Sequence, residues 1–547
     1  MEGVASLRMR NLLQAAGCLG AFAVGACGGA ATTSHGGTVV VATAADAETL
    51  FPPLGRALST KTVTDVLFDK LAEIGPALNT VGDAGFAPRL AQRWDWSNDS
   101  LRLTFHLDPH ARWHDGVPLR ASDVRFAFSI YTDPAVGASG GEELSLALDS
   151  ISVDDSVSCT AWFKRRSPEQ FLTLVFNLVP LPEHLLGRTP RDSLKTSPFA
   201  RLPVGSGPFR LVSWEPRVRI EVAAVDSFYR GRPKLDRVIW SIAPDMSGAV
   251  RKLLAGEADF LEQLPIDAAA VAVKRPDLKV VPYGWFDYGF LRFNLRDGAK
   301  NRPHPMFGER AVRRALSMAL DRRLMVRSVF DSLAKVGLGP FVRAQWTSDS
   351  SLVQLPFDRA AAARTLDSLG WRAGPDGVRE KDSRPFSFTL LFPASSRNRQ
   401  RYAVLIQEQL RQLGVTVKLE ALDFNAFRAR MDKHEFEAVL DGTHPDPSPR
   451  GIRESWTSRG IDAASGRNLG AYANPLFDAQ VDSAFALLDA PSAKARFRAA
   501  YQTIIDDAPA IWLFEQAAIA GMTSRLRTGP LRADAWWLGL SSWSISP

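Results

Sequence analysis

Three histidines spaced four residues apart, His106, His110 and His114, are the residues whose spacing first suggests chemistry in this chain. On one helix that spacing would bring the imidazoles to a common face, where they could bind zinc. Pro109 lies between the first two, and a strand followed by a turn cannot supply such a face. We therefore expect no metal site here. The pair His114-Asp115 has the residue types of a general base and its orienting acid, so that interpretation stays open at this point.

The elements that would position these histidines are a strand, a turn and a helix. Residues 101–107 alternate apolar and polar side chains, which is the period of a strand with one buried face. Residues 114–116 form the expected turn. Apolar residues then recur through 124–130, which predicts a helix capped by Ser122 or Asp123.

A second candidate for chemistry is the glycine-rich segment Gly205-Ser206-Gly207. It lacks the Lys-Ser/Thr of a phosphate-binding loop and the spaced glycines of a dinucleotide site. It also lacks the Gly-x-Ser-x-Gly context of a hydrolase nucleophile. The glycines and the prolines beside them instead predict a tight turn between strands. We expect no catalytic residues, and a secreted hydrolase is kept only as an alternative.

Length and charge limit the classes of protein that this chain can belong to. At 547 residues it is too long for one hydrophobic core, so we expect two or three lobes. Its 46% hydrophobic and 23% charged residues are ordinary for a globular protein. The net charge of +7 comes from Arg spread along the chain, without the basic block of a nucleic-acid-binding protein. We expect no nucleic-acid partner.

The N-terminus has the pattern of an exported lipoprotein. Two arginines precede an apolar run over residues 12–26, which is shorter than the roughly 20 residues of a membrane span. The run ends in Val24-Gly25-Ala26-Cys27, which resembles a lipobox, so Cys27 is the expected lipid attachment site. These features predict a lipoprotein signal peptide over 1–27 and a flexible tether over 28–37. The protein would be anchored by lipid to a bacterial membrane, facing the periplasm or the cell exterior.

Short motifs spread along most of residues 37–547 indicate a known family. They are Trp113-His114-Asp115-Gly116-x-Pro118, Ala121-x-Asp123-Val124-x-Phe126, Pro203-Val204-Gly205-Ser206-Gly207-Pro208-Phe209, Leu253-Leu254-x-Gly256-Glu257-x-Asp259 and Tyr472-x-Asn474-Pro475-x-Phe477-Asp478. This set resembles the family 5 extracellular solute-binding proteins, which serve peptide-type and nickel-type ABC importers. In that family the His-Asp-Gly segment is a structural turn. The resemblance implies the same role for His114 and argues against a general base.

The resemblance implies an α/β fold with two lobes, like the periplasmic binding proteins, and an extra subdomain in the first lobe. The residues themselves favour a parallel α/β lobe, since a strand, a helix and a strand follow one another over 388–419. Residues 38–43 are typical of a buried strand. The expected divisions are 38–66, 200–287 and 512–547 for a discontinuous lobe I, 67–199 for the inserted subdomain and 288–511 for lobe II.

The function that the resemblance implies is binding without catalysis or a cofactor. A peptide or peptide-like solute would enter a cleft between the lobes, and the lobes would close by a hinge motion. The closed form, expected as a monomer, would dock on the transmembrane subunits of an ABC permease. A nickel-chelate or haem binding protein of the same family is the competing function, for which His434 or His444 could supply a ligand.

The candidate binding residues also come from the resemblance. In peptide-binding relatives an Asp of the second lobe holds the α-amine of the peptide, and here Thr443 occupies that position. Arg56 falls near a first-lobe position where some relatives carry an acid. An uncompensated ammonium in a closed cleft is costly, so we expect free-amine peptides to bind poorly unless Asp441 substitutes. The full set of ligand-binding candidates is Asp441, Gly442, Thr443, Arg56, Ala57, Leu58, Trp285 and Tyr288.

Overall fold

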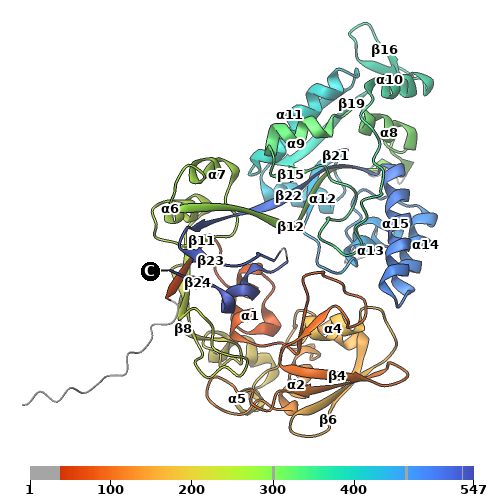
Figure 1. Cartoon of the computed structure of the whole chain (residues 1–547). Coiled ribbons are helices and arrows are strands. Elements are labelled where there is room, and N and C mark those ends of the chain that lie inside the picture. The colour runs from red at the N-terminus through yellow and green to blue at the C-terminus, as the bar shows by residue number, and fades with distance from the viewer. Residues whose placement is uncertain (1–36, 298–301, 462–465, 533, 547) are drawn as a thin grey trace, which may run out of the picture. The chain divides into compact units, whose positions relative to one another are not determined.

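A computed structural model describes residues 37–297, 302–461, 466–532 and 534–546, with the backbone alone at Trp285 and Phe286 (Figure 1). The predicted signal peptide, Cys27 and all of the predicted tether except Gly37 lie outside the described residues. Within the described part, no helix is both long enough and apolar enough to cross a membrane.

The largest element is an eleven-stranded mixed sheet with the order β20-β19-β21-β12-β22-β11-β1-β10-β9-β8, in which β15 also pairs with β22. Its strands are β1 (Thr38–Thr43), β8 (Phe209–Glu215), β9 (Arg219–Ala224), β10 (Arg237–Ile242), β11 (Phe260–Leu261), β12 (Leu278–Phe293), β15 (Ala334–Lys335), β19 (Ser387–Pro393), β20 (Thr416–Leu422), β21 (Ala438–Thr443) and β22 (Ala510–Thr523). The strands β12 and β22 contain 16 and 14 residues and pair antiparallel along most of their length. They join the β19–β21 part of the sheet to the part that contains β1 and β8–β11.

The parallel α/β arrangement predicted over 388–419 is confirmed. β19 pairs parallel with β20 and with β21, and α11 (Arg397–Arg411) connects β19 to β20. Tyr402, Ile406 and Leu410 recur every four residues and are buried, which gives α11 one apolar face. The strand predicted at 38–43 is β1, and it pairs parallel with β10 and β11.

The predicted inserted subdomain is built on an antiparallel sheet of order β4-β5-β7-β6, with a two-stranded sheet, β2-β3, beside it in the sequence. Its elements are β2 (Ala72–Ile74), β3 (Phe86–Pro88), β4 (Ala91–Trp96), β5 (Arg102–Leu107), β6 (Leu148–Val153), β7 (Ser158–Phe163), α2 (Ala121–Tyr131), α3 (Gly141–Ala147), α4 (Gln170–Asn177) and α5 (Glu183–Leu186). The strand predicted over 101–107 is confirmed as β5. The predicted cap at Ser122 or Asp123 is wrong, because α2 begins at Ala121 and the Asp123 carboxylate accepts the Arg120 N–H at 2.9 Å from inside the first turn.

The His114 turn is structural, as the resemblance implied. Its Nδ1 accepts a hydrogen bond from Gly205 N–H at 3.2 Å, and its Nε2 donates to Gly207 O at 3.0 Å. Burial lowers the pKa of His114 to about 4, so the ring is neutral at pH 7, with one donor and one acceptor. A Cβ on Gly205 would lie 1.9 Å from Leu67 O, so only glycine allows the turn to pack this closely.

The remaining described elements are helices and short strands, and the strands among them form small separate sheets. The other α-helices of the described residues are α1 (Leu58–Leu67), α6 (Met246–Leu254), α7 (Ile266–Ala272), α8 (Arg310–Met318), α9 (Arg322–Phe330), α10 (Arg359–Ser368), α12 (Phe424–Asp432), α13 (Gly451–Trp456), α14 (Pro475–Ala486) and α15 (Ala490–Asp507). Short pieces are η1 (Pro52–Leu54), η2 (Arg191–Thr196), η3 (Pro198–Ala200), η5 (Ser458–Gly460), η6 (Trp536–Ser542), β13 (Arg296–Asp297), β14 (Arg302–Pro303), β16 (Arg372–Ala373), β17 (Arg379–Lys381), β18 (Arg384–Pro385), β23 (Leu526–Arg527) and β24 (Ser544–Ile545). The predicted limits of the lobes stay a prediction.

Candidate functional site

A cavity of about 530 Å³, which we name the cleft, is lined by segments that lie far apart in the sequence. They come from the start of α1, the β2-β3 pair, α4, β12, residues 444–447 after β21 and residues 534–538 near the C-terminus. The cleft is therefore bounded by both predicted lobes and by the predicted subdomain. Its volume suits a small ligand. A hollow of about 960 Å³ against α9 is lined from residues 320–357 alone, so the cleft is the better candidate site.

One side of the cleft is apolar. The side chains that give it this character come from β2, β3 and α4, and they are Ile74, Phe86, Leu172, Val175 and Phe176. An apolar surface of this kind would bury an aliphatic or aromatic part of a ligand, whose removal from water favours binding.

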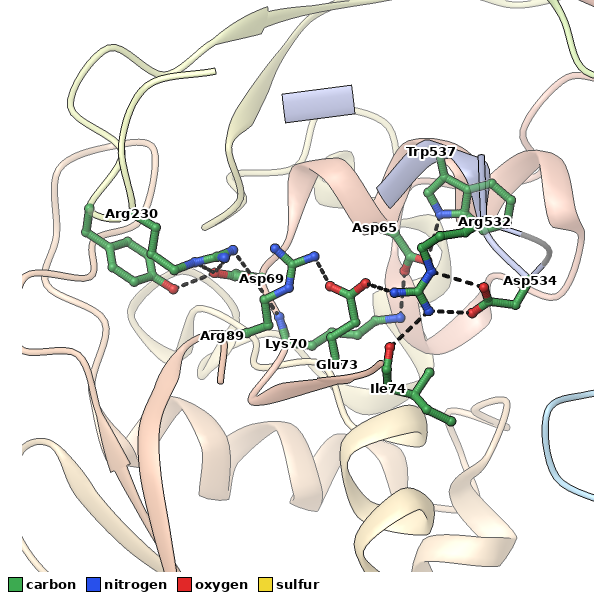
Figure 2. Close-up of polar contacts among 11 residues, drawn as sticks. Asp65, Asp69, Lys70, Glu73, Ile74, Arg89, Arg230, Arg532, Asp534 and Trp537 are labelled. Carbon is green, nitrogen blue, oxygen red and sulfur yellow. Dashed lines mark hydrogen bonds and ion pairs between the residues drawn. The ribbon is translucent and has the colours of Figure 1, made fainter. Parts of the chain in front are cut away.

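Another part of the cleft lining is charged. Side chains of α1, β2 and the C-terminal segment meet there, and we name them the charged wall: Asp65, Lys70, Glu73, Arg532, Asp534 and Trp537 (Figure 2). Lys70 Nζ lies 2.9 Å from Asp65 Oδ1, and Trp537 Nε1 donates to Asp65 Oδ2 at 3.0 Å. Arg532 donates to Glu73 Oε1 at 2.7 Å and to the two carboxylate oxygens of Asp534 at 3.0 and 2.7 Å. These contacts fix the wall in one arrangement.

The charged wall continues beyond Glu73 through Arg89, Asp69 and Arg230 (Figure 2). Arg89 also pairs with Glu73, and burial lowers the pKa of the Arg89 guanidinium while Asp69 raises it. Asp69 binds Arg230 through contacts of 2.9 and 3.0 Å, and it accepts a hydrogen bond from Tyr229. Every carboxylate of this wall therefore has a cation against it, and the wall as a unit is close to neutral.

Two further cations line the cleft near the start of α1. Lys61 Nζ lies 5.2 Å from the centre of the Phe176 ring, and Arg56 Nη2 donates to Gly137 O at 3.4 Å. Among the described residues, neither side chain has a carboxylate within ion-pair distance. Asp446 and His444 line the cleft from predicted lobe II, and His444 Nδ1 lies 3.5 Å from Oδ1 of Asp287, which ends the 200–287 segment of predicted lobe I and also lines the cleft.

Only part of the predicted site lies in the cleft lining. Arg56 and Leu58 line it, and Ala57 between them is the N-cap residue of α1. Asp441, Gly442 and Thr443 end β21, immediately before the lining residues 444–447. The side chain of Trp285 lies outside the described residues.

Tyr288 and Asp441 have partners away from the cleft lining. Tyr288 is buried on β12, with its ring centre 5.5 Å from that of Phe290 and 6.3 Å from that of Trp512. Asp441 accepts the Gly442 N–H at 2.8 Å and lies 3.4 Å from the buried Arg292 guanidinium. Asp441 is thus already compensated by a cation, which disfavours it as the partner of a ligand amine.

The residues that sequence reasoning missed include Lys61, Asp65, Lys70, Asp287 and Asp534. Lys61 and Asp65 are four apart on α1, so their common face was available from helical spacing. Asp534 is far from α1 in the sequence, and no local pattern brings it to the same wall.

The histidines that suggested metal chemistry have separate partners. His106 Nε2 lies 2.9 Å from Asp95 Oδ2, His110 Nδ1 lies 3.1 Å from Asp108 Oδ1, and His434 Nδ1 bonds Leu469 O at 2.9 Å. Across the described ranges, no group of three or more His, Cys, Asp or Glu side chains is arranged to hold a metal ion.

Two long strands, β12 and β22, join the two parts of the mixed sheet, and residues from both predicted lobes line the cleft, which is the arrangement of a two-lobed binding protein. Residues 85–462 match the model of the bacterial extracellular solute-binding proteins, family 5. The chain belongs to this family, which confirms the resemblance seen in the sequence. Since its members bind solutes, the protein is a binding protein and not an enzyme.

Curated and solved relatives agree with this assignment. The oligopeptide-binding protein AppA of Bacillus subtilis is 28% identical over 444 residues, which cover 78% of this chain and 79% of AppA. The structure of AppA in complex with a nonapeptide has a TM-score of 0.73 at 24% identity and covers 94% of this chain and 100% of AppA. NikZ of Campylobacter jejuni in complex with Ni(L-His) has a TM-score of 0.75 at 22% identity, covering 93% and 99%. These two structures support the two-lobed periplasmic-binding-protein fold.

Proposed function

We propose that this protein is the substrate-binding component of an ABC importer and captures a peptide or peptide-like solute in the cleft. The observation that carries the proposal is the cleft itself, which combines an apolar surface with charged groups from both predicted lobes. A peptide offers both kinds of partner, since it has charged ends and apolar side chains. The similarity to an oligopeptide-binding protein supports this choice of solute.

In this proposal the long strands β12 and β22 act as the hinge. Solute contacts on both sides of the cleft would stabilise a closed arrangement, and the closed protein would dock as a monomer on the transmembrane subunits of a permease. Delivery would take place in the periplasm or at the cell exterior, in keeping with the extracellular family.

The experiment that tests the proposal is mass spectrometry of whatever co-purifies with the protein, followed by calorimetry with a mixed library of dipeptides to pentapeptides. We expect the extracted solute to contain peptide bonds and library members to compete with it. A solute without peptide bonds, together with no heat from any library member, would rule out the peptide assignment.

The second candidate is a nickel-chelate binder, favoured by the fold similarity to NikZ and by His444 in the cleft lining. Haem binding is tested with it, because both ligands absorb visible light. An absorbance spectrum and a metal analysis of the purified protein distinguish these functions from peptide binding. A stoichiometric metal content or a haem band would replace the peptide proposal.

Cys27 is expected to carry the lipid anchor, as the sequence Val24-Gly25-Ala26-Cys27 indicates. In a detergent phase-partitioning assay on protein expressed with its own N-terminus, the wild type should enter the detergent phase. Cys27→Ser should move to the aqueous phase because the acylated thiol is lost, while Cys159→Ser, which changes a buried cysteine, should not. Wild-type protein in the aqueous phase would contradict the anchor.

A further inference from the structure

The hollow of about 960 Å³ against α9, which we name the α9 hollow, is separate from the cleft. It is lined by residues of α9 and the two residues before it, and by residues of the segments 336–343 and 352–357. None of these residues also lines the cleft, so a ligand in the α9 hollow would leave the cleft free. Its volume is within the range of small-molecule sites in proteins.

The three parts of this lining are joined to one another through Arg322, in the first turn of α9. Arg322 Nη1 donates to Gln354 Oε1 at 2.6 Å, and Arg322 Nη2 donates to Leu355 O. Gln354 Nε2 donates to Leu338 O. These bonds hold the segment 352–357 against both α9 and the segment 336–343. The α9 hollow is therefore a fixed feature of the fold.

The α9 hollow carries positive charge that is only partly compensated. Arg322 is 7% exposed, and both oxygens that accept the hydrogen bonds just described belong to uncharged groups. Among the residues that the structure describes, no carboxylate lies within ion-pair distance of Arg322, Arg323 or Arg327, which all line the hollow. Burial lowers the pKa of Arg322 to about 10, and Asp321, which caps α9, raises it by a smaller amount. A buried cation without a paired anion is costly, so an anion entering the hollow would be stabilised.

Arg343, which also lines the α9 hollow, differs from these three arginines. It forms an ion pair with Glu515 of β22 and donates to Val336 O at 3.0 Å. The Glu515 side chain is largely buried, so this pair is shielded from water. The charge of Arg343 is thus already compensated, and the unpaired positive charge of the hollow lies along α9.

The rest of the lining is mostly apolar and includes large side chains that face water. Leu324, Val353 and Phe357 are exposed, whereas Leu320 and Leu352, which also line the hollow, are buried. Covering exposed apolar surface with an apolar group is favourable in water. A ligand that suits this lining therefore combines an anionic group with an apolar body.

We infer that the α9 hollow is a second binding site, which takes a small amphipathic anion with a carboxylate or a similar anionic group on an aliphatic body. The arginines of α9 bind the anionic group, since the planar donors of a guanidinium match a carboxylate. The exposed apolar side chains cover the aliphatic body. This site is additional to the proposed solute site in the cleft and does not depend on which solute the cleft binds.

The test is calorimetry with octanoate as the probe, compared with 1-octanol, which lacks the charge, and with hexanoate, which has a shorter chain. Octanoate should bind with one molecule per protein. It should bind about 10- to 100-fold more tightly than 1-octanol, the effect of a charge-assisted contact. Each methylene that the hollow covers increases affinity about fourfold, so octanoate should bind about 15-fold more tightly than hexanoate.

Variants of α9 locate the bound probe. Leu324→Glu should reduce octanoate binding at least about 10-fold, because it places a carboxylate three residues before Arg327 on the same helix face. The matched control is Val404→Glu on α11, since Leu324 and Val404 are both 52% exposed on a helix. This control should bind octanoate as the wild type does. Replacing both Arg323 and Arg327 by Met should weaken octanoate binding about 10-fold and leave the affinity for 1-octanol unchanged.

Lys61→Met, which removes a cation of the cleft lining, distinguishes the two cavities. Octanoate binding that is lost in Lys61→Met and kept in Leu324→Glu would place the probe in the cleft and overturn the inference. Equal affinity for octanoate and 1-octanol, or no binding of octanoate by the wild type, would also overturn it. Peptide binding should be the same in Leu324→Glu as in the wild type, so either result leaves the proposed function to its own test.

Discussion

Replacing Arg532 by Met should lower the free energy of unfolding by about 3–5 kcal/mol, the usual loss when one member of a buried ion pair is removed. Arg532 holds Glu73 and Asp534 and also donates to Ile74 O at 2.9 Å (Figure 2). Its side chain is 20% exposed and those of the two acids are 13% and 11% exposed, so the carboxylates would stay largely buried after the loss. Arg89 would still pair with Glu73, but Asp534 would lose its cation.

Urea denaturation followed by circular dichroism measures this effect. The matched control is Arg219→Met, which breaks an ion pair with Glu215 whose side chains are 46% and 50% exposed. An exposed pair contributes at most about 1 kcal/mol, so the control should change stability little. A loss for Arg532→Met no larger than that of the control would contradict a buried, mutually dependent charged wall.

Removing Arg532 should also weaken solute binding, because Glu73 and Asp534 line the cleft. Arg532→Lys should recover part of the stability through its charge. It cannot recover the wall's geometry, since an ammonium lacks the planar pair of donors that binds both Asp534 oxygens.

Much of the secondary structure could be predicted from local patterns of apolar residues in the sequence. β1, β5 and the unit from β19 to β20 follow from runs of apolar residues whose period or β-branching decides between strand and helix. The sequence predicts a cap at Ser122 or Asp123, whereas α2 begins at Ala121 and the Asp123 side chain reaches back from the first turn to the Arg120 N–H. A carboxylate near a helix start is compatible with both positions, and the sequence does not distinguish them.

Fewer of the residues that line the cleft could be predicted from the sequence, because the cleft is formed by contacts between distant segments. The resemblance predicts a ligand contact at Thr443. This residue ends β21, and the cleft lining begins one residue later, at His444. Asp534 had no recognisable signal, since it joins the charged wall only through Arg532 and through contacts between distant segments. Burial and long-range charge are properties of the folded chain, which no single-sequence pattern supplies.

Glu169→Gln should shift the protein toward an open arrangement and weaken solute binding about 10- to 100-fold. The partly buried Glu169 carboxylate, in the predicted subdomain, accepts hydrogen bonds from Thr80 Oγ1 at 2.5 Å and from Ser448 Oγ at 2.8 Å. Trp346 Nε1 donates to the same Thr80 hydroxyl at 2.9 Å. Ser448 and Trp346 belong to predicted lobe II, so this cluster links the two sides of the molecule away from the charged wall.

The size of the effect follows from the chemistry of the link. A carboxylate accepts both hydroxyl donors, whereas the amide of Gln offers one oxygen and places an NH₂ group against the other donor. Losing one charge-assisted hydrogen bond weakens the linked state by roughly 1.5–3 kcal/mol, which is about one to two powers of ten in the closing equilibrium. Binding that requires closure weakens by the same factor as the closed fraction falls.

The measurement is a distance distribution between spin labels at Lys164→Cys in the predicted subdomain and Leu476→Cys on α14, both exposed positions. Without solute, Glu169→Gln should show a larger population at long distance than the protein with Glu169. Glu143→Gln is the matched control, because Glu143 also faces predicted lobe II but lies 4.0 Å from Arg450 with its side chain 47% exposed. If Glu169→Gln and Glu143→Gln give the same distribution as the unmodified background, the Glu169 contacts do not hold the lobes together, and closure must depend on the solute alone.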